Sequence, residues 1–175
     1  ATGGLAPEKH QAHTLETGRY VNERELVDVF TAEGKQAVQQ LEEWGVDVHW
    51  KEGGVSVRSE SLNPMVGGMG MTLPLVERCR ELGVDVEYPL TVDRLLQQEF
   101  GGRVVGAEAV TPDGPRHRFF AHCTVLATGG GGWLFARTDN PAGISGDGYR
   151  LALGAGARLR YMEFVQCYLI GSGPD

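Results

Sequence analysis

The sequence predicts an α/β fold that carries an inserted three-stranded antiparallel β-meander. Two helical patterns of apolar residues, at 23–44 and 72–82, precede a run of alternating residues between 90 and 127. Apolar spacings of three and four residues indicate helix, and alternation indicates a strand with one buried face. The short apolar run "TVLA" at 124–127 is typical of a buried parallel strand. Together these elements favour the α/β class.

The first helix is expected after a stretch, residues 1–20, that lacks clear periodicity. Asn22 and Glu25 have the spacing of a capping box for a helix over 23–44, and Gly45 suits the left-handed position that ends a helix. The segments "VDVHW" and "VSVR" then alternate on either side of "KEGG". This pattern predicts a hairpin, or two short strands.

The second helix is expected to follow a loop that ends at residue 71. Thr72 is its predicted N-cap, and Pro74 falls in the first turn, where a missing N–H costs little. Gly83 is predicted to end it. The segment "VDVEYP" at 84–89 then predicts a strand.

The meander is expected to consist of "TVDRLLQQE", "RVVGAEAV" and "RHRFFAHC", joined by turns at Gly101-Gly102 and "TPDG". A last helix is predicted over 147–155. Ser145 is its expected cap and Gly156 its expected stop.

Composition excludes several classes of partner. A length of 175 residues favours one domain, and the net charge of −7 argues against nucleic acid and anionic membranes. No apolar run approaches 18 residues, the length expected of a membrane span. The three cysteines lack a C-x-x-C pair and the histidines form no H-x-x-x-H, which predicts no disulfide framework, no metal site and a reducing cytoplasm. Both ends of the chain look cut, so we expect a longer protein.

The glycine run in "VLATGGGGWLF", at 125–135, matches no phosphate-binding motif. No window completes G-x-G-x-x-G, and no Gly-Lys-Ser or Gly-Lys-Thr occurs. Two interpretations stay open from spacing alone. The run forms a turn where backbone passes close to backbone, or it lets a ligand lie against a chain without Cβ atoms.

The order of motifs resembles a known family. "RVVGA" is followed by "VLATGGGG", then by "SGDG" at the start of a helix, then by "MEFVQ". "ATGG" at 1–4 is similar to the family's A-Q-G-G loop. The order resembles the flavoprotein subunit of the succinate dehydrogenase and fumarate reductase superfamily, which also includes L-aspartate oxidase and ketosteroid dehydrogenases. It implies that residues 1–175 form a partial, Rossmann-like FAD-binding domain.

The resemblance implies an FAD-dependent oxidoreductase in which hydride passes to or from flavin N5. It assigns this chain no catalytic residue and no metal ligand. The cofactor-binding residues that it implies are Thr2, Gly3, Gly4, Val105, Ala127, Thr128, Gly129, Gly130 and Asp147. The residues that it implies on the substrate side are Glu163, Gln166 and Tyr168.

Each of these assignments has a structural alternative. Asp147 also suits the start of a helix, where an acid interacts favourably with the dipole. Val105, like its neighbour Val104, also fits plain strand core. Glu163 and Gln166 also fit a satisfied polar pair. These alternatives stay open at this point.

The chain departs from the family's pattern within the matched region. Tyr168 stands where dicarboxylate-reducing members have a histidine, and the following proline is absent. A tyrosine can hydrogen-bond a substrate but carries no positive charge at neutral pH. His13 stands where many members have aspartate. These differences favour a divergent flavoprotein whose substrate is unknown.

Other parts of the family's site do not occur in the sequence. These are the N-terminal G-x-G-x-x-G unit, the capping domain with its arginine, and the C-terminal FAD segment. We therefore expect the 175 residues alone to be inactive and to bind FAD weakly or not at all. An iron–sulfur electron-transfer partner is left open.

A second hypothesis is a non-catalytic binding or interaction module derived from a flavoprotein. Unpaired sheet edges recruit partners, so self-association is possible under it. A nicotinamide-dependent dehydrogenase is disfavoured, because it needs a complete βαβ fingerprint with its ribose-binding acid.

Overall fold

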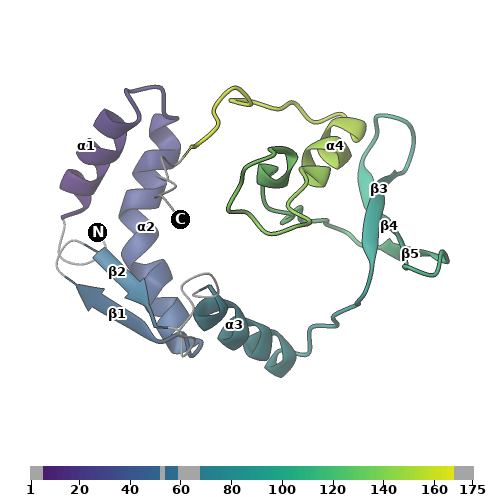
Figure 1. The fold of residues 1–175 in the computed structure, drawn as a ribbon, viewed down its shortest axis with the longest axis horizontal. Coiled ribbons are helices and arrows are strands. Elements are labelled where there is room, and N and C mark those ends of the chain that lie inside the picture. The colour runs from purple at the N-terminus through teal and green to yellow at the C-terminus, as the bar shows by residue number, and fades with distance from the viewer. Residues whose placement is uncertain (1–5, 52–53, 59–67, 168–175) are drawn as a thin grey trace, which may run out of the picture. The chain divides into compact units, whose positions relative to one another are not determined.

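The computed structural model describes residues 6–51, 54–58 and 68–167 and divides into two compact units, Ala1–Val86 and Glu87–Asp175. The elements, in chain order (Figure 1), are α1 (Pro7–Thr17), α2 (Arg24–Glu43), β1 (Val48–Lys51), β2 (Gly54–Val57), α3 (Met69–Glu81), β3 (Thr91–Gln97), β4 (Val104–Val110), β5 (Arg116–Phe120), the short 3-10 helix η3 (Gly132–Leu134) and α4 (Asp147–Gly154).

Helix α1 occupies residues for which the sequence showed no periodicity. It begins with a proline at its first position and has Glu8 in its first turn, both favourable at a helix N-terminus. It packs beside α2, where Gln11 Nε2 donates to Asp28 Oδ1 over 2.6 Å and the His10 ring lies edge-on to Phe30. None of its residues is buried, so no apolar stripe marked it.

Helix α2 confirms the predicted helix over 23–44, but the capping box is wrong. Glu23 is the N-cap, and no side chain caps the helix. The Asn22 amide instead lies so close to Gly18 that a Cβ there would overlap it. The end is as predicted: Gly45 has φ +89°, and Val46 N–H donates to the Leu41 carbonyl over 3.0 Å.

Strands β1 and β2 confirm the predicted hairpin, because Val48 pairs antiparallel with Val57 and Lys51 with Gly54. Helix α3, however, begins at Met69, before the predicted cap. Thr72 lies inside it, where its hydroxyl donates to the Gly68 carbonyl over 3.1 Å, as threonine can within a helix. Pro74 is therefore an interior residue and not part of the first turn.

Two predicted strands are wrong. Residues 84–89 and 124–127 have no strand structure, and Tyr88 and Val125 are 89% and 85% exposed. Both sheets of the described chain are antiparallel, and neither includes these segments. An apolar segment forms a stable strand only where a neighbour pairs with it, and within the described residues no segment pairs with these two. The parallel, Rossmann-like part of the fold stays a prediction.

The three-stranded meander is confirmed. Its strand order is β3-β4-β5, and all neighbours are antiparallel. Glu108 in the central strand is the direct partner of Arg94 in β3 and of Arg118 in β5. Gly101 and Gly114, with φ of +75° and +99°, form the turns that the sequence predicted.

Helix α4 confirms the predicted last helix, but its cap is Gly146, at φ +76°, and not Ser145. Gly156 ends it at φ +88°, as predicted. The helix lies against β3 in the same unit (Figure 1). Arg150 Nη1 donates to the Asp93 carbonyl over 3.1 Å, and Gln97 Nε2 donates to the Ala155 carbonyl over 3.2 Å. Across the described ranges, no helix is long and apolar enough to cross a membrane.

Candidate functional site

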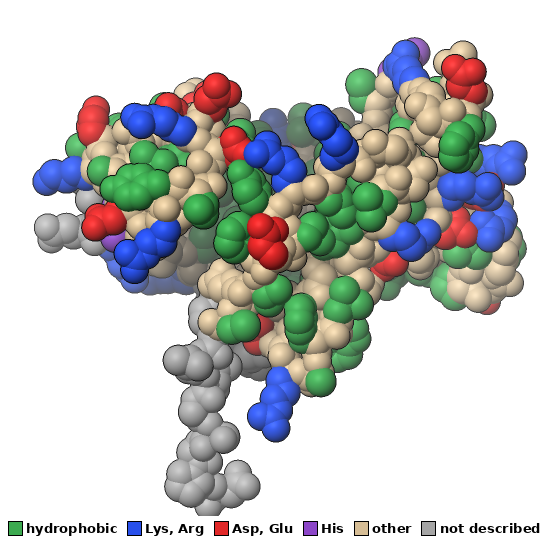
Figure 2. Space-filling view, turned by 90° about the horizontal axis from the view of Figure 1, so that it is seen from above, with side chains coloured by type: hydrophobic (Ala, Val, Ile, Leu, Met, Phe, Trp, Pro, Cys, Tyr) green, Lys and Arg blue, Asp and Glu red, His purple; other side chains and the backbone are tan. Residues whose placement is uncertain are grey.

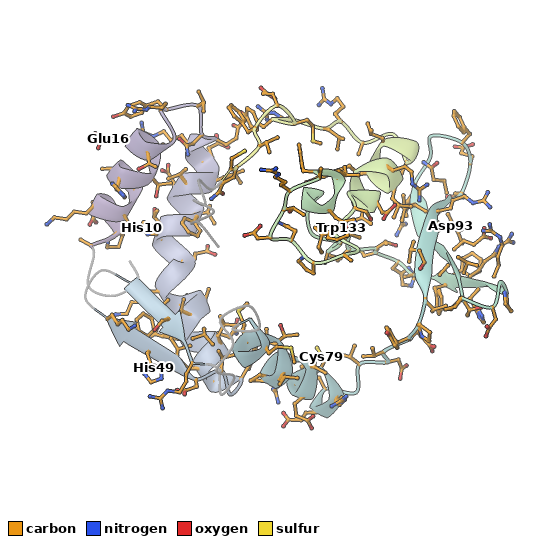
Figure 3. The ribbon with its side chains drawn as sticks, in the orientation of Figure 1. His10, Glu16, His49, Cys79, Asp93 and Trp133 are labelled. Carbon is orange, nitrogen blue, oxygen red and sulfur yellow. The ribbon has the colours of Figure 1, made fainter. Side chains whose placement is uncertain are left out.

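The candidate site lies where the glycine run meets the start of α4. Gly146 N–H donates to the Gly130 carbonyl over 3.1 Å, and Trp133 N–H donates to the Ile144 carbonyl over 3.0 Å. Figure 3 labels Trp133 in this segment. The first bond joins "TGGGG" to "SGDG" through their main chains, and the second joins residues that flank these motifs.

Two of the four consecutive glycines pack against other parts of the chain. A Cβ on Gly132 would lie 2.5 Å from Asn140 Cγ, and a Cβ on Gly131 would already contact Gly146 Cα at 3.5 Å. Any side chain at 132 would displace the Asn140 side chain, whereas a methyl group at 131 would make an ordinary contact with Gly146. The interpretation of the run as a close turn therefore applies here.

The other two glycines are less crowded, since a Cβ on Gly129 would meet only Ile144 Cδ1, at 3.6 Å. Gly129 adopts φ +71°, which disfavours a side chain whatever the space around it. Gly130 has no such constraint, and a Cβ there would meet no atom within 4 Å. No contact among the described residues requires glycine at 130, as is also true of Gly34.

Gly148 brings the second motif against the first. It is buried in the first turn of α4, and a Cβ on it would overlap the Thr128 hydroxyl. Only a residue without Cβ allows this approach of the helix to the loop. The structure thus places Thr128 and Gly130 beside the start of α4.

Asp147 is the first residue of α4, and its side chain is 55% exposed. Ser145 Oγ donates to its Oδ2 over 2.5 Å, and Arg150 Nε lies 4.0 Å from its Oδ1. A carboxylate at this position is stabilised by the free N–H groups of the first turn. Because most of it faces solvent, it can also accept a hydrogen bond from a ligand hydroxyl.

The remaining predicted residues lie outside the glycine run and the start of α4. Val105 is half-buried in β4, and its carbonyl accepts from Ala121 N–H over 3.0 Å. Ala127, Glu163 and Gln166 are exposed, the last two in the segment after α4. The residues that lie outside the described chain are Thr2, Gly3, Gly4 and Tyr168.

An ion-pair cluster in the meander was not predicted. Glu108 is 1% exposed, and three arginines surround its carboxylate. Arg94 Nη2 and Arg118 Nε each lie 2.7 Å from it, and Arg116 Nη1 lies 2.9 Å away. Figure 2 shows basic side chains around acidic ones on the right, over the meander. A charged residue inside the apolar run "VVGAEAV" was the signal that could have revealed it.

Hydrogen bonds from Arg118 and then Arg94 lower the pKa of Glu108 to about 2. Its carboxylate is therefore ionised throughout the physiological range. The hydrogen bond from Arg116 to Asp93 Oδ2, at 2.7 Å, raises the pKa of Arg116. Figure 3 labels Asp93 on β3. Elsewhere in the part of the chain that is described, no group of three or more His, Cys, Asp or Glu could hold a metal ion.

Comparison with known proteins places the chain among flavoproteins. Residues 2–171 match the family described as FAD binding domain. The chain is 35% identical to L-aspartate oxidase of Caulobacter vibrioides, over 94% of the chain and 34% of that protein. It is 28% identical to one subunit of the fumarate reductase (CoM/CoB) of Methanothermobacter marburgensis, over 95% of the chain and 32% of that protein. It thus spans about a third of the length of these relatives.

Solved structures show the same fold. A flavocytochrome c3 fumarate reductase in an open conformation matches 85% of the chain and 29% of its own, with a TM-score of 0.70 and 24% identity. Sdh1 of Mycobacterium smegmatis, in complex with UQ1, matches 87% of the chain and 29% of its own. Its TM-score is 0.68 and its identity is 25%.

Proposed function

The chain belongs to the FAD binding domain family, and we propose that it is part of an FAD-dependent oxidoreductase of the fumarate reductase, succinate dehydrogenase and L-aspartate oxidase type. The family and the relatives indicate FAD as the cofactor. Bound flavin would supply hydride transfer. The observation that carries the proposal is the open backbone at Gly130 beside the first turn of α4.

The residues present fit this cofactor. Backbone without a Cβ at Gly130 leaves room for close approach, and the first turn of α4 has free N–H groups for phosphate oxygens. Asp147 would accept a hydrogen bond from a cofactor hydroxyl, and Ser145 fixes its carboxylate. Thr128 and Gly148 would hold the loop and helix together. Val105 would contribute apolar surface from β4.

The substrate side of the proposed enzyme would include Glu163, Gln166 and Tyr168. An uncharged tyrosine at 168 would recognise a substrate by hydrogen bonding and not by a positive charge. We therefore propose a substrate other than fumarate or succinate. An iron–sulfur electron-transfer partner belongs to the same proposal, on the likeness to a fumarate reductase subunit.

Two glycine substitutions test the cofactor site in the protein that contains this chain. The structure leaves open space for a Cβ at both Gly130 and Gly34, so both Gly130→Ala and Gly34→Ala should fold. Only the first would place a methyl group against FAD. We expect Gly130→Ala to lower FAD affinity at least about tenfold, since bound ligands tolerate little overlap. Flavin absorbance of the purified variants, with Gly34→Ala as the matched control, measures this; equal flavin content in both would contradict the proposal.

We also propose that residues 1–175 form only part of the FAD-binding domain. Their sequence completes no G-x-G-x-x-G, the motif that places pyrophosphate at a helix N-terminus. The chain alone should therefore bind FAD weakly and be inactive. Titration followed by flavin fluorescence tests this, and a tight, stoichiometric yellow complex would show that the domain is sufficient.

A further inference from the structure

Strand β5 is an edge of the meander and is exposed along its whole length. The strand order is β3-β4-β5, so β4 pairs with one side of β5 and no described strand pairs with the other. All five residues of β5 are exposed. Edge strands present unpaired N–H and C=O groups to any extended chain that approaches them.

The register identifies which residues carry these groups. Thr111 N–H donates to the Pro115 carbonyl, and Ala121 N–H donates to the Val105 carbonyl, at the two ends of the β4–β5 ladder. Hydrogen bonding alternates along an antiparallel pair. His117 and Phe119 therefore bond to β4. The residues whose N–H and C=O groups point away from β4 are Arg116, Arg118 and Phe120.

The same three residues share one face of the sheet, because side chains alternate along a strand. This face also carries Glu108 and its cross-strand partner Arg94. The face is basic: three guanidinium groups surround two carboxylates, those of Glu108 and Asp93. One positive charge is left over on a chain whose net charge is −7. Phe120 adds an apolar side chain that is 73% exposed.

Charged side chains on an edge strand often prevent pairing. Here they do not extend outward along the edge, because Arg116 and Arg118 reach across the sheet to Glu108. Their side chains remain 54% and 64% exposed, and most of their N–H donors are not used by these bonds. The edge is left accessible, and the arginines are held in fixed positions beside it. Fixed guanidinium groups bind carboxylates with less loss of side-chain entropy than mobile ones.

We propose that β5 docks an extended, acidic segment of a partner protein, which adds to the meander as a fourth strand with its carboxylates beside Arg116 and Arg118. Main-chain bonds to Arg116, Arg118 and Phe120 would supply affinity, and the arginines would select for acidic side chains. This inference does not rest on the proposed FAD site. A second copy of this chain does not fit, because two antiparallel β5 strands would place arginines beside arginines.

A peptide-binding experiment on the protein that contains this chain tests the proposal. The probe is a fluorescein-labelled peptide of alternating Glu and Thr, followed by fluorescence anisotropy. We expect binding that weakens as salt rises, since exposed charge pairs are screened. The same peptide with Lys in place of Glu should not bind. A third peptide is the Glu peptide N-methylated at alternate residues, a change that removes main-chain donors but keeps the charges. If the peptide pairs with β5 as a strand, this third peptide should bind at least about tenfold more weakly.

Protein variants complete the test. Arg116→Gln combined with Arg118→Gln should raise the Kd of the Glu peptide about tenfold. Arg24→Gln, which removes an exposed charge at the start of α2, is the matched control and should leave it unchanged. The N-methylated and Lys peptides leave the protein intact, so they remain decisive if the double variant fails to fold. Two results would overturn the proposal by showing a simple anion-binding surface. One is that the N-methylated peptide binds as tightly as the unmodified Glu peptide, and the other is that inorganic tripolyphosphate fully displaces the Glu peptide.

Discussion

Gly148 is the residue that allows the close contact between α4 and the loop that contains the glycine run. A Cβ at this position would overlap the Thr128 hydroxyl. We expect Gly148→Ala to lower the free energy of unfolding by about 1–3 kcal/mol, the usual cost of overpacking a close contact. Urea unfolding of the variant and the unsubstituted protein measures it.

A double-mutant cycle tests whether Thr128 is the cause. Thr128→Ala removes the hydroxyl and methyl groups that the new Cβ would meet, so it should reduce the cost of Gly148→Ala. Coupled residues in contact show interaction energies of about 0.5–3 kcal/mol. If the two substitutions have simply additive effects, the steric explanation is wrong.

Residues whose role depends on their own backbone were predicted well from sequence. Gly45, Gly83 and Gly156 all adopt positive φ at helix ends, because no other residue suits that conformation as well. The caps at Asn22 and Ser145 were wrong. Spacing shows that a side chain could reach a helix N–H, but not that another partner is nearer. Asn22 lies over Gly18, and Ser145 bonds to the neighbouring Asp147.

The meander is the element whose stability should depend on acid pH. The pKa of Glu108 is lowered to about 2 in the folded chain by its arginine partners, against about 4.3 for an unperturbed glutamate. A carboxyl group whose pKa is lower in the folded chain stabilises the fold fully at pH values above its pKa in the unfolded chain. This stabilisation is lost as the pH falls towards its pKa in the folded chain. We expect stability to decline progressively from about pH 4.5 towards pH 2.

Glu108→Gln isolates this contribution, because glutamine keeps the size of the side chain and removes the titrating group. The variant should be less stable at pH 7, and its stability should change less between pH 4.5 and pH 2. Unfolding by urea at a series of pH values provides the comparison. Parallel pH curves for the two proteins would show that another carboxyl group is responsible.

Element predictions succeeded where the elements pair or pack within the described chain. The hairpin, the meander, α2 and α4 were all marked by periodicity and by turn glycines. Residues 84–89 and 124–127 carry the same kind of pattern, but no strand in the part of the chain that is described pairs with them. Periodicity indicates which face a segment could bury. The segment forms a strand only where a neighbouring strand pairs with it. Helix α1 shows the converse, since it forms without burying any residue.

For the molecule as a whole, the cofactor site stays a prediction, and it rests on the order of motifs and not on their spacing. The glycine run fits no phosphate motif, yet a main-chain hydrogen bond joins Gly130 to Gly146 of "SGDG". The sequence could not separate the glycines that pack against the chain from the one with open backbone. That distinction depends on Gly146 and Asn140, which come from elsewhere in the chain. Likewise, cross-strand register alone brings Arg94 and Arg118 to Glu108.

The balance of buried and exposed apolar side chains leads to a prediction for the chain on its own. In the described residues, the buried apolar residues are Val27, Val46, Ala109 and Leu151. Many larger ones are exposed, and Figure 2 shows several apolar groups on one face. Exposed apolar patches favour association. We expect residues 1–175 to bind a hydrophobic dye and to self-associate as concentration rises.

Salt distinguishes this association from acidic-peptide docking at β5. Burial of apolar surface is strengthened by sulfate, whereas exposed ion pairs are weakened by any salt. Sedimentation velocity of the chain should therefore show larger species as sodium sulfate is added, while the acidic peptide dissociates from β5 in the same series. Substituting Arg116 and Arg118 with glutamine should leave self-association unchanged. A chain that stays monomeric at all concentrations and salts would contradict the prediction. In that case, the apolar side chains of each unit would be too dispersed to form a common interface.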